Sequence, residues 1–182
     1  MMAKARLKEL YEQKIRSQLQ KELGIKNIME VPKLNKIVLN VGVSDAVADS
    51  KALQTVSDVV EKIAGQRPIK TKARKSIAGF KIREGMLLGV MVTLRGKKMY
   101  EFLDRLINLA LPQVRDFQGV SPRLDGRGNY NLGIKDWIIF PEVSFDLVQK
   151  FYGLNVSINT TAKKDLHAFE LLKSFGMPFR QK

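Results

Sequence analysis

Cysteine is absent from the 182 residues, and histidine occurs once, as His167. The lack of cysteine excludes disulfide bonds, thiol catalysis and cysteine-bound metals, and it fits a reducing compartment. Nucleophilic catalysis needs a nucleophile and a base that lie together. The one imidazole stands in KKDLHAFELL, a helical pattern, so we interpret His167 as a half-exposed helix residue and catalysis as the rarer alternative. The sequence therefore predicts neither an enzyme nor a metal or cofactor site.

Long apolar runs are also missing. The longest, residues 85–94, is about half of the roughly 18 residues that a membrane-spanning helix needs. The N-terminal MMAKARLKELYEQK lacks the apolar core of a signal peptide, and Glu9 and Glu12 argue against a transit peptide. We therefore expect a cytoplasmic chain that has no membrane partner.

Acidic residues are scarce relative to basic ones. Lysine and arginine number 32 against 18 acidic residues, which gives a net charge of +14 and a pI near 10.0. The excess is uneven, because residues 66–98 carry ten basic side chains and one acidic one, Glu84, for a net charge of +9. A solvated surface normally mixes both signs, so this stretch indicates a polyanionic partner, and the lack of a membrane span favours nucleic acid.

Hydrophobic periodicity predicts one α+β domain over residues 1–182, with a mostly antiparallel sheet and helices packed on one face. Helices are expected at residues 3–23, 51–64, 97–110 and 164–175. Strands are expected at residues 36–43, 67–71, 87–95, 137–140 and 154–160. The segment 117–133 is rich in Gly, Asn, Asp and Pro and is predicted to be irregular, although it is long for a structureless loop.

Strand alternation predicts a polar, open face on this sheet. In residues 87–95, Val90 and Val92 point toward the core, whereas Thr93 and Arg95 point away from it. Asn40 of the first strand falls on the same outer face, and Gln66 is expected beside it. Amide, hydroxyl and guanidinium groups on an uncovered sheet suit RNA sugar-phosphate and 2′-hydroxyl contacts. A plain solvated face is an equally good interpretation of the pattern alone.

The tract KTKARKSIAGFKIREG, residues 70–85, combines clustered lysines and arginines with Gly79, Gly85 and a lone aromatic, Phe80. Basic side chains displace counterions from phosphates, glycine permits close backbone approach, and an exposed Phe can stack on a base. A mobile solvated loop is the alternative, and burial of Ile77 and Phe80 stays open.

Other motifs are weaker. DGRGNY at residues 125–130 lacks the spacing and flanking elements of a nucleotide-binding loop, so a turn is the better interpretation. Four carboxylates, Glu101, Asp104, Asp116 and Asp125, show no metal-binding spacing. Each has an arginine nearby in sequence, so ordinary ion pairing is favoured.

Several long motifs occur in order along the chain: TKARKSIAGFKIREG from Thr71, VTLRG from Val92, DGRGNYNLGI from Asp125 and IIFPE from Ile138. VPKLNKIVLNVGV, AGQRP and the ending GMPFR accompany them. Together they resemble the family of bacterial large-subunit ribosomal protein five, which binds 5S ribosomal RNA, and the resemblance covers nearly the whole chain.

This resemblance implies a structural place in the central protuberance of the large subunit, attaching 5S rRNA to the subunit and its rRNA. A concave sheet face would meet 5S rRNA through the positions Asn40, Gln66, Thr93 and Arg95. The basic loop, residues 72–85, would reach the tRNA in the peptidyl site. Its candidate contact residues are Lys72, Arg74, Lys75, Ser76, Phe80, Lys81 and Arg83.

The resemblance also implies a contact with a small-subunit head protein across the intersubunit bridge, on residues that the sequence does not place. Two positions depart from the family: Glu84 stands where Gln is frequent and Gln118 where Arg is common. Both departures remove positive charge. The competing hypotheses are an RNA- or DNA-acting enzyme and a non-ribosomal protein that binds structured RNA or DNA. An enzyme would need an acid, base or metal cluster, and a DNA-compacting protein would bind duplex DNA and structured RNA equally well.

Overall fold

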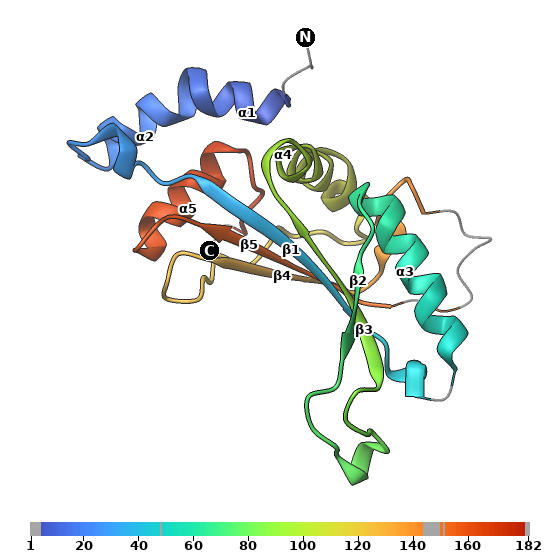
Figure 1. The fold of residues 1–182 in the computed structure, drawn as a ribbon. Helices are drawn as coiled ribbons and strands as arrows, with labels where there is room; N and C mark the ends of the chain where they lie inside the picture. The colour runs from blue at the N-terminus through green and yellow to red at the C-terminus, as the bar shows by residue number, and fades with distance from the viewer. Residues whose placement is uncertain (1–4, 48, 144–149, 151, 181–182) are drawn as a thin grey trace. The chain divides into compact units, whose positions relative to one another are not determined.

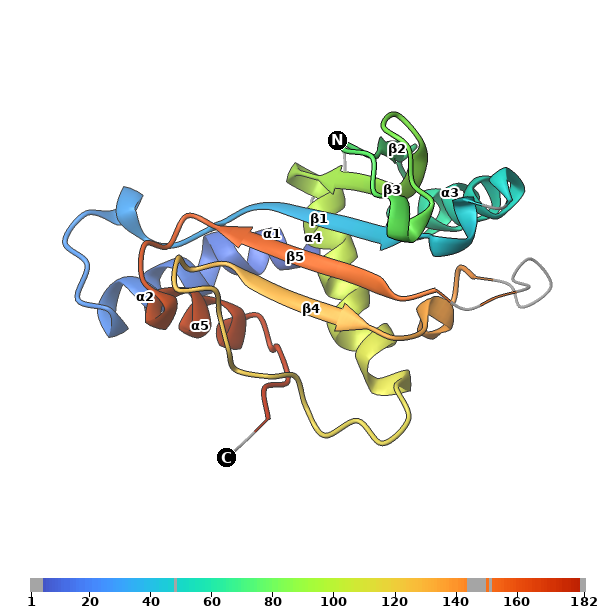
Figure 2. The ribbon, with the colours of Figure 1, turned by 90° about the horizontal axis from the view of Figure 1, so that it is seen from below.

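The computed structural model describes residues 5–47, 49–143, 150 and 152–180, and its strands form one five-stranded sheet in the order β2-β3-β1-β5-β4 (Figure 1). The strands are β1 (Leu34–Gly42), β2 (Ile69–Lys72), β3 (Leu87–Leu94), β4 (Tyr130–Ile134) and β5 (Leu154–Thr160). Strand β2 pairs with β3 in antiparallel register, and Figure 2 shows β1 and β5, and β5 and β4, pointing in opposite directions. The predicted α+β class is confirmed.

The α-helices are α1 (Arg6–Leu10), α2 (Arg16–Glu22), α3 (Ser50–Ala64), α4 (Gly96–Arg105) and α5 (Asp165–Ser174). A π-helical turn, Tyr11–Ile15, joins α1 to α2 without a break, so the predicted first helix is confirmed from Arg6 to Glu22. Its predicted beginning lies outside the described residues. None of the described helices is both long and apolar enough to span a membrane.

The chain divides into two compact units. Unit 1 comprises Met1–Ile37, Leu94–Leu132 and Ser157–Lys182, and unit 2 comprises Val38–Thr93 and Gly133–Val156. Each unit thus collects segments that are distant in sequence. The prediction of a single domain stays a prediction.

Unit 1 buries the apolar stripes of its helices against its strand segments. Leu19 of α2, Phe102 of α4 and Leu171 of α5 are all fully buried. The rings of Tyr11 and Phe175 stack with centroids 6.1 Å apart, which ties the N-terminal helix to the end of α5. In Figure 2 these helices lie behind the strands of unit 1, so they cover one face of the sheet there.

In unit 2, helix α3 contributes the side chains of Val56, Val60 and Ile63 to the core, and all three are buried. The side chain of Asp49 accepts a hydrogen bond from the backbone N of Lys51 at 2.8 Å and caps the helix at its N-terminus. Gly65 ends the helix in the left-handed conformation that glycine commonly adopts after the last helical turn.

Two sequence predictions are wrong. Residues 137–140 form a 3₁₀ turn, Trp137–Ile139, and not a strand. The backbone N of Phe140 bonds to the carbonyl of Trp137 at 3.1 Å, and both aromatic side chains are buried at this three-residue spacing. The segment 117–133 is not irregular throughout, because its end belongs to β4, where Tyr130 and Ile134 are buried.

The helical path that starts with α4 also runs further than the sequence predicts. A π-helical turn, Leu106–Ala110, and a 3₁₀ turn, Leu111–Gln113, extend it past the predicted end at residue 110. Pro112 stands in the first turn of the 3₁₀ segment, a position at which proline is tolerated.

Candidate RNA-binding surfaces

The strands of unit 2 present one buried and one partly open face. Leu39 and Val41 of β1 are fully buried, whereas Asn40 between them is half-buried on the other side. On β3, Val92 is buried and Thr93 is half-buried. The alternation that the sequence predicts is therefore confirmed for Asn40 and Thr93.

Gln66 and Thr93, 27 residues apart in sequence, are brought together in unit 2. The Nε2 of Gln66 donates a hydrogen bond to the backbone O of Thr93 at 3.4 Å. This bond fixes the amide of Gln66, which itself is half-buried in the turn between α3 and β2. The bond therefore places the amide of Gln66 next to the backbone of β3 at Thr93.

Arg95 belongs to unit 1, directly after β3, and its side chain is exposed. Its Nη1 donates to the Oδ1 of Asn35 at 3.3 Å. Sequence reasoning missed Asn35, although an asparagine at the start of an alternating strand was the available signal. A polar group that holds a guanidinium extended prepares it for an acceptor on a partner.

The basic loop of unit 2, residues 72–85, is an ordered hairpin. At its base, the backbone N of Ala73 bonds to the O of Met86 at 2.8 Å, and Gly85 N bonds to Ala73 O at 3.0 Å. Nearer the tip, Ile77 and Ile82 exchange two backbone bonds of 2.9 and 3.1 Å. Backbone hydrogen bonds therefore link the two arms of the loop both at its base and near its tip.

Ser76 and Phe80, both predicted tRNA contacts, have different surroundings. The Oγ of Ser76 accepts a hydrogen bond from Glu84 N at 2.9 Å, so this hydroxyl helps to close the hairpin. The ring of Phe80 is 71% exposed at the tip, and Ile77 is 46% exposed. Burial of these two residues in a core is thus wrong, and the ring of Phe80 is accessible for stacking.

The predicted basic side chains of the hairpin are exposed to solvent. All five of these side chains are exposed: Lys72, Arg74, Lys75, Lys81 and Arg83. Among the described residues, none of these five side chains takes part in an ion pair. A cluster of cations without acidic partners raises the local potential and favours phosphate.

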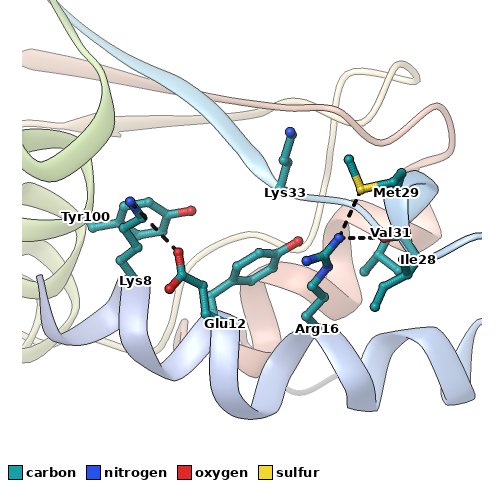
Figure 3. Close-up of a pocket in the computed structure, with 9 residues that line it drawn as sticks. Lys8, Glu12, Arg16, Ile28, Met29, Val31, Lys33 and Tyr100 are labelled. Atoms are coloured by element: carbon teal, nitrogen blue, oxygen red, sulfur yellow. Dashed lines mark hydrogen bonds and ion pairs between the residues drawn. The ribbon is translucent and has the colours of Figure 1, made fainter. Parts of the chain in front are cut away.

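Figure 3 shows a pocket of about 330 Å³ in unit 1, between the α1–α2 helix and the segment that precedes β1. Its lining residues are Lys8, Tyr11, Glu12, Arg16, Ile28, Met29, Val31, Lys33 and Tyr100. Several polar groups are already engaged within the protein: Lys8 pairs with Glu12 at 3.9 Å, and Arg16 Nη2 donates to the O of Ile28 at 3.3 Å. Burial raises the pKa of Tyr100 to about 12, so its hydroxyl stays protonated. We interpret the pocket as a gap in the packing between the N-terminal helix and the segment before β1, and not as a ligand site.

Two of the four carboxylates considered as metal ligands, Glu101 and Asp104, form ion pairs. Asp104 binds the guanidinium of Arg6, which lowers the pKa of this carboxyl, and Glu101 pairs with Lys97 at 3.5 Å. The ion-pairing interpretation is confirmed for both, although each partner differs from the arginine nearest in sequence. In the described ranges, no three acidic or histidine side chains gather as a metal site. His167 lies half-buried on α5, as predicted.

Comparison with known proteins places the chain in a family. Residues 27–83 match the family model described as Ribosomal protein L5, and residues 87–179 match the model that describes the C-terminus of the same ribosomal family. The large ribosomal subunit protein uL5 of Moorella thermoacetica is 58% identical over 178 residues, which cover 97% of this chain and 99% of that protein. The uL5 protein of Leptospira biflexa is 57% identical over 96% of both chains, and that of Geobacter sulfurreducens is 56% identical over 97% of this chain and 99% of its own. On these matches, which together span nearly all of its length, the chain belongs to the ribosomal protein L5 family.

Proposed function

We propose that this chain, as a structural and non-catalytic constituent of the large ribosomal subunit, binds 5S rRNA through the open face of its sheet. It also touches the tRNA in the peptidyl site through the basic hairpin at residues 72–85. The same proposal includes a contact with a head protein of the small subunit and further contacts with large-subunit rRNA. It also places the chain in ribosomes of the cytoplasm.

One observation carries the 5S rRNA assignment: polar side chains stand on the partly open face while the opposite face is buried. Asn40 and Thr93 are half-buried beside core neighbours whose exposure is 0–3%. Gln66 is held against Thr93, and Arg95 is held by Asn35. Fixed amide, hydroxyl and guanidinium groups suit the 2′-hydroxyl and phosphate groups of structured RNA.

Alanine variants test this face. We expect Asn40→Ala and Arg95→Ala each to weaken 5S rRNA binding by about 1–3 kcal/mol, because each removes a polar partner from the interface. Lys21→Ala is a matched control, since it removes an exposed cation from α2 of unit 1. Binding is measured by titration of labelled 5S rRNA at fixed salt, with duplex DNA in parallel. Unchanged affinity in both variants would remove the sheet-face assignment, and equal affinity for duplex DNA would favour a general nucleic-acid binder.

The tRNA assignment is supported by the charge and order of the hairpin. Five lysine and arginine side chains surround a tip whose aromatic ring is 71% exposed. Because the backbone bonds of the hairpin already exist, binding to tRNA loses little further backbone entropy. Lysine and arginine supply phosphate contacts, and Phe80 supplies a stacking surface.

Removing residues 74–81 tests the hairpin separately from the sheet face. The deletion leaves the bonds of Ala73 to Gly85 and Met86 at the base of the hairpin, so β2 and β3 keep their connection. We expect unchanged 5S rRNA affinity and weaker retention of peptidyl-site tRNA in reconstituted ribosomes. Phe80→Ala is the point variant that isolates stacking, with an expected loss of about 1–3 kcal/mol. Loss of 5S rRNA binding with tRNA retention unchanged would reverse the two assignments.

A further inference from the structure

Unit 1 assembles a second group of cations that charge counting along the sequence does not show. Its members are Lys33, Arg127, Lys163 and Lys164, and all four side chains are exposed. They come from three segments: the entry to β1, the loop before β4, and the turn between β5 and α5. Figures 1 and 2 show these three segments side by side. We call these four residues the unit 1 cation cluster.

Reciprocal hydrogen bonds join Lys33 to Thr161, 128 residues away in sequence. The backbone N of Lys33 donates to the Oγ1 of Thr161 at 3.0 Å, and Thr161 N donates to the O of Lys33 at 2.9 Å. The turn that bears Lys163 and Lys164 is therefore tied directly to the start of β1.

The loop that bears Arg127 is held against the same turn. The carboxylate of Asp165, at the start of α5, accepts hydrogen bonds from Gly126 N at 3.0 Å and from Gly128 N at 2.8 Å. Thr160 Oγ1 donates to the O of Gly128. These bonds occupy the nearby carboxylate of Asp165 with backbone N–H donors, while the side chain of Arg127 between the two glycines stays exposed.

Asp125 stiffens this loop from within. Its Oδ1 accepts from the backbone N atoms of Arg127 and Asn129 at 2.8 and 2.9 Å, and its Oδ2 accepts from the side chain of Asn129. The side-chain bond from Asn129, together with these backbone bonds, lowers the pKa of Asp125. The sequence motif DGRGN thus folds into a rigid support for one exposed guanidinium.

Polar side chains of unit 1 lie close to the cluster. Arg95 is bonded to Asn35, which stands two residues after Lys33. On β5, Asn159 is half-buried on the face opposite Ile158, and its Nδ2 donates to the Oδ1 of Asn129 at 3.2 Å. Asn35 and Asn129, which make these two bonds, are each two residues from a member of the cluster, Lys33 and Arg127.

We propose that the unit 1 cation cluster binds phosphates of the same 5S rRNA that the sheet face is proposed to recognise. This inference rests on the proposed function. Four lysine and arginine side chains without acidic partners among the described residues are the chemistry that neutralises an RNA backbone. The hydrogen bonds between their three segments hold the backbones that bear them together, which a flexible basic tail would not do. The cluster adds contacts that position the RNA but carry no base specificity.

Directed hydroxyl-radical cleavage tests the partner in assembled particles. The natural chain has no cysteine, so Lys163→Cys and the control Lys21→Cys each create one attachment point for an iron chelate. After incorporation into large subunits, we expect the tether at residue 163 to cut 5S rRNA at sites that the tether at residue 21 does not cut. Cuts confined to large-subunit rRNA, or no cuts beyond those of the control, would overturn the assignment.

Charge reversal supplies the energetic test. The pair Lys163→Glu and Lys164→Glu is compared with Lys14→Glu and Lys21→Glu, which changes the net charge equally on the exposed side of the N-terminal helix. We expect the first pair to weaken 5S rRNA binding at least about tenfold more than the second, and to reduce the salt dependence of log Kd by about one unit per lost phosphate contact. Equal losses in the two pairs would contradict the proposal. Wild-type binding of 5S rRNA in the same titration reports on the proposed function itself, so the two failures are distinct.

Discussion

Gly128 shows how one residue can fix the geometry of a loop. Its φ of +76° is in the left-handed region, and a Cβ at this position would lie 2.4 Å from the carbonyl O of Ala162. Gly126 has a similar φ of +82° but has nothing within 4 Å of a built Cβ. A side chain at Gly126 would therefore meet only backbone strain, whereas a side chain at Gly128 would meet both backbone strain and a steric clash.

At this scale, we expect Gly126→Ala to lower the free energy of unfolding by about 1–2 kcal/mol, the cost of a left-handed alanine. Gly128→Ala adds a clash with backbone, so we expect a loss of about 2–5 kcal/mol. Urea denaturation monitored by circular dichroism measures both. Equal losses for the two variants would show that the loop can move away from the turn before α5.

At the scale of the element, helix α3 depends on its cap. Asp49→Ala removes the acceptor for Lys51 N, and we expect the free energy of unfolding to fall by about 0.5–2 kcal/mol. Asp49→Asn keeps a side-chain oxygen at this position and is expected to retain most of the stability. If both variants lost the same amount, the charge of Asp49 near the helix N-terminus, and not the hydrogen bond, would be responsible.

Elements with strong periodicity were predictable from sequence, and weakly patterned ones were not. Residues 51–64 have an apolar stripe, a capping residue and a terminal glycine, and α3 follows all three. Strand β4 has only five residues, Asn131 and Gly133 among them, and its burial depends on partners distant in sequence. The apolar run at residues 137–140 is compatible with a strand. The structure instead forms a 3₁₀ turn there, in which Trp137 and Phe140, three residues apart, are both buried.

Some features of the candidate RNA-binding surfaces were likewise predictable from sequence, and others were not. Alternation alone placed Asn40 and Thr93 on the outer face of the sheet. The role of Ser76 in closing the hairpin, the support of Arg95 by Asn35 and the unit 1 cation cluster all depend on tertiary hydrogen bonds. The bonds of Arg95 and of Lys33 join segments that are distant in sequence, and the bond of Ser76 depends on how the hairpin folds, so no local pattern encodes them.

At the scale of the whole molecule, a net charge of +14 makes binding to any polyanion strongly dependent on salt. Specific recognition should still appear as stabilisation of the folded chain. With free 5S rRNA at about 100 times its Kd, we expect the free energy of unfolding to rise by about 2.7 kcal/mol. Urea titrations at fixed salt, followed by the fluorescence of the single tryptophan, measure this shift. Duplex DNA at the same phosphate concentration should give a smaller shift, and an equal one would indicate a purely electrostatic effect.

The discontinuity of unit 1 has a consequence for the order of events during synthesis. Its first segment, Met1–Ile37, is made before all of unit 2, but its last, Ser157–Lys182, is made after all of unit 2. Unit 2, which ends at Val156, has all its segments before that point. Because contacts between such distant segments close slowly, unit 1 should mature after unit 2 and only after translation of these residues is complete. During synthesis, the basic hairpin of unit 2 would then fold before Lys33 can form its hydrogen bonds with Thr161.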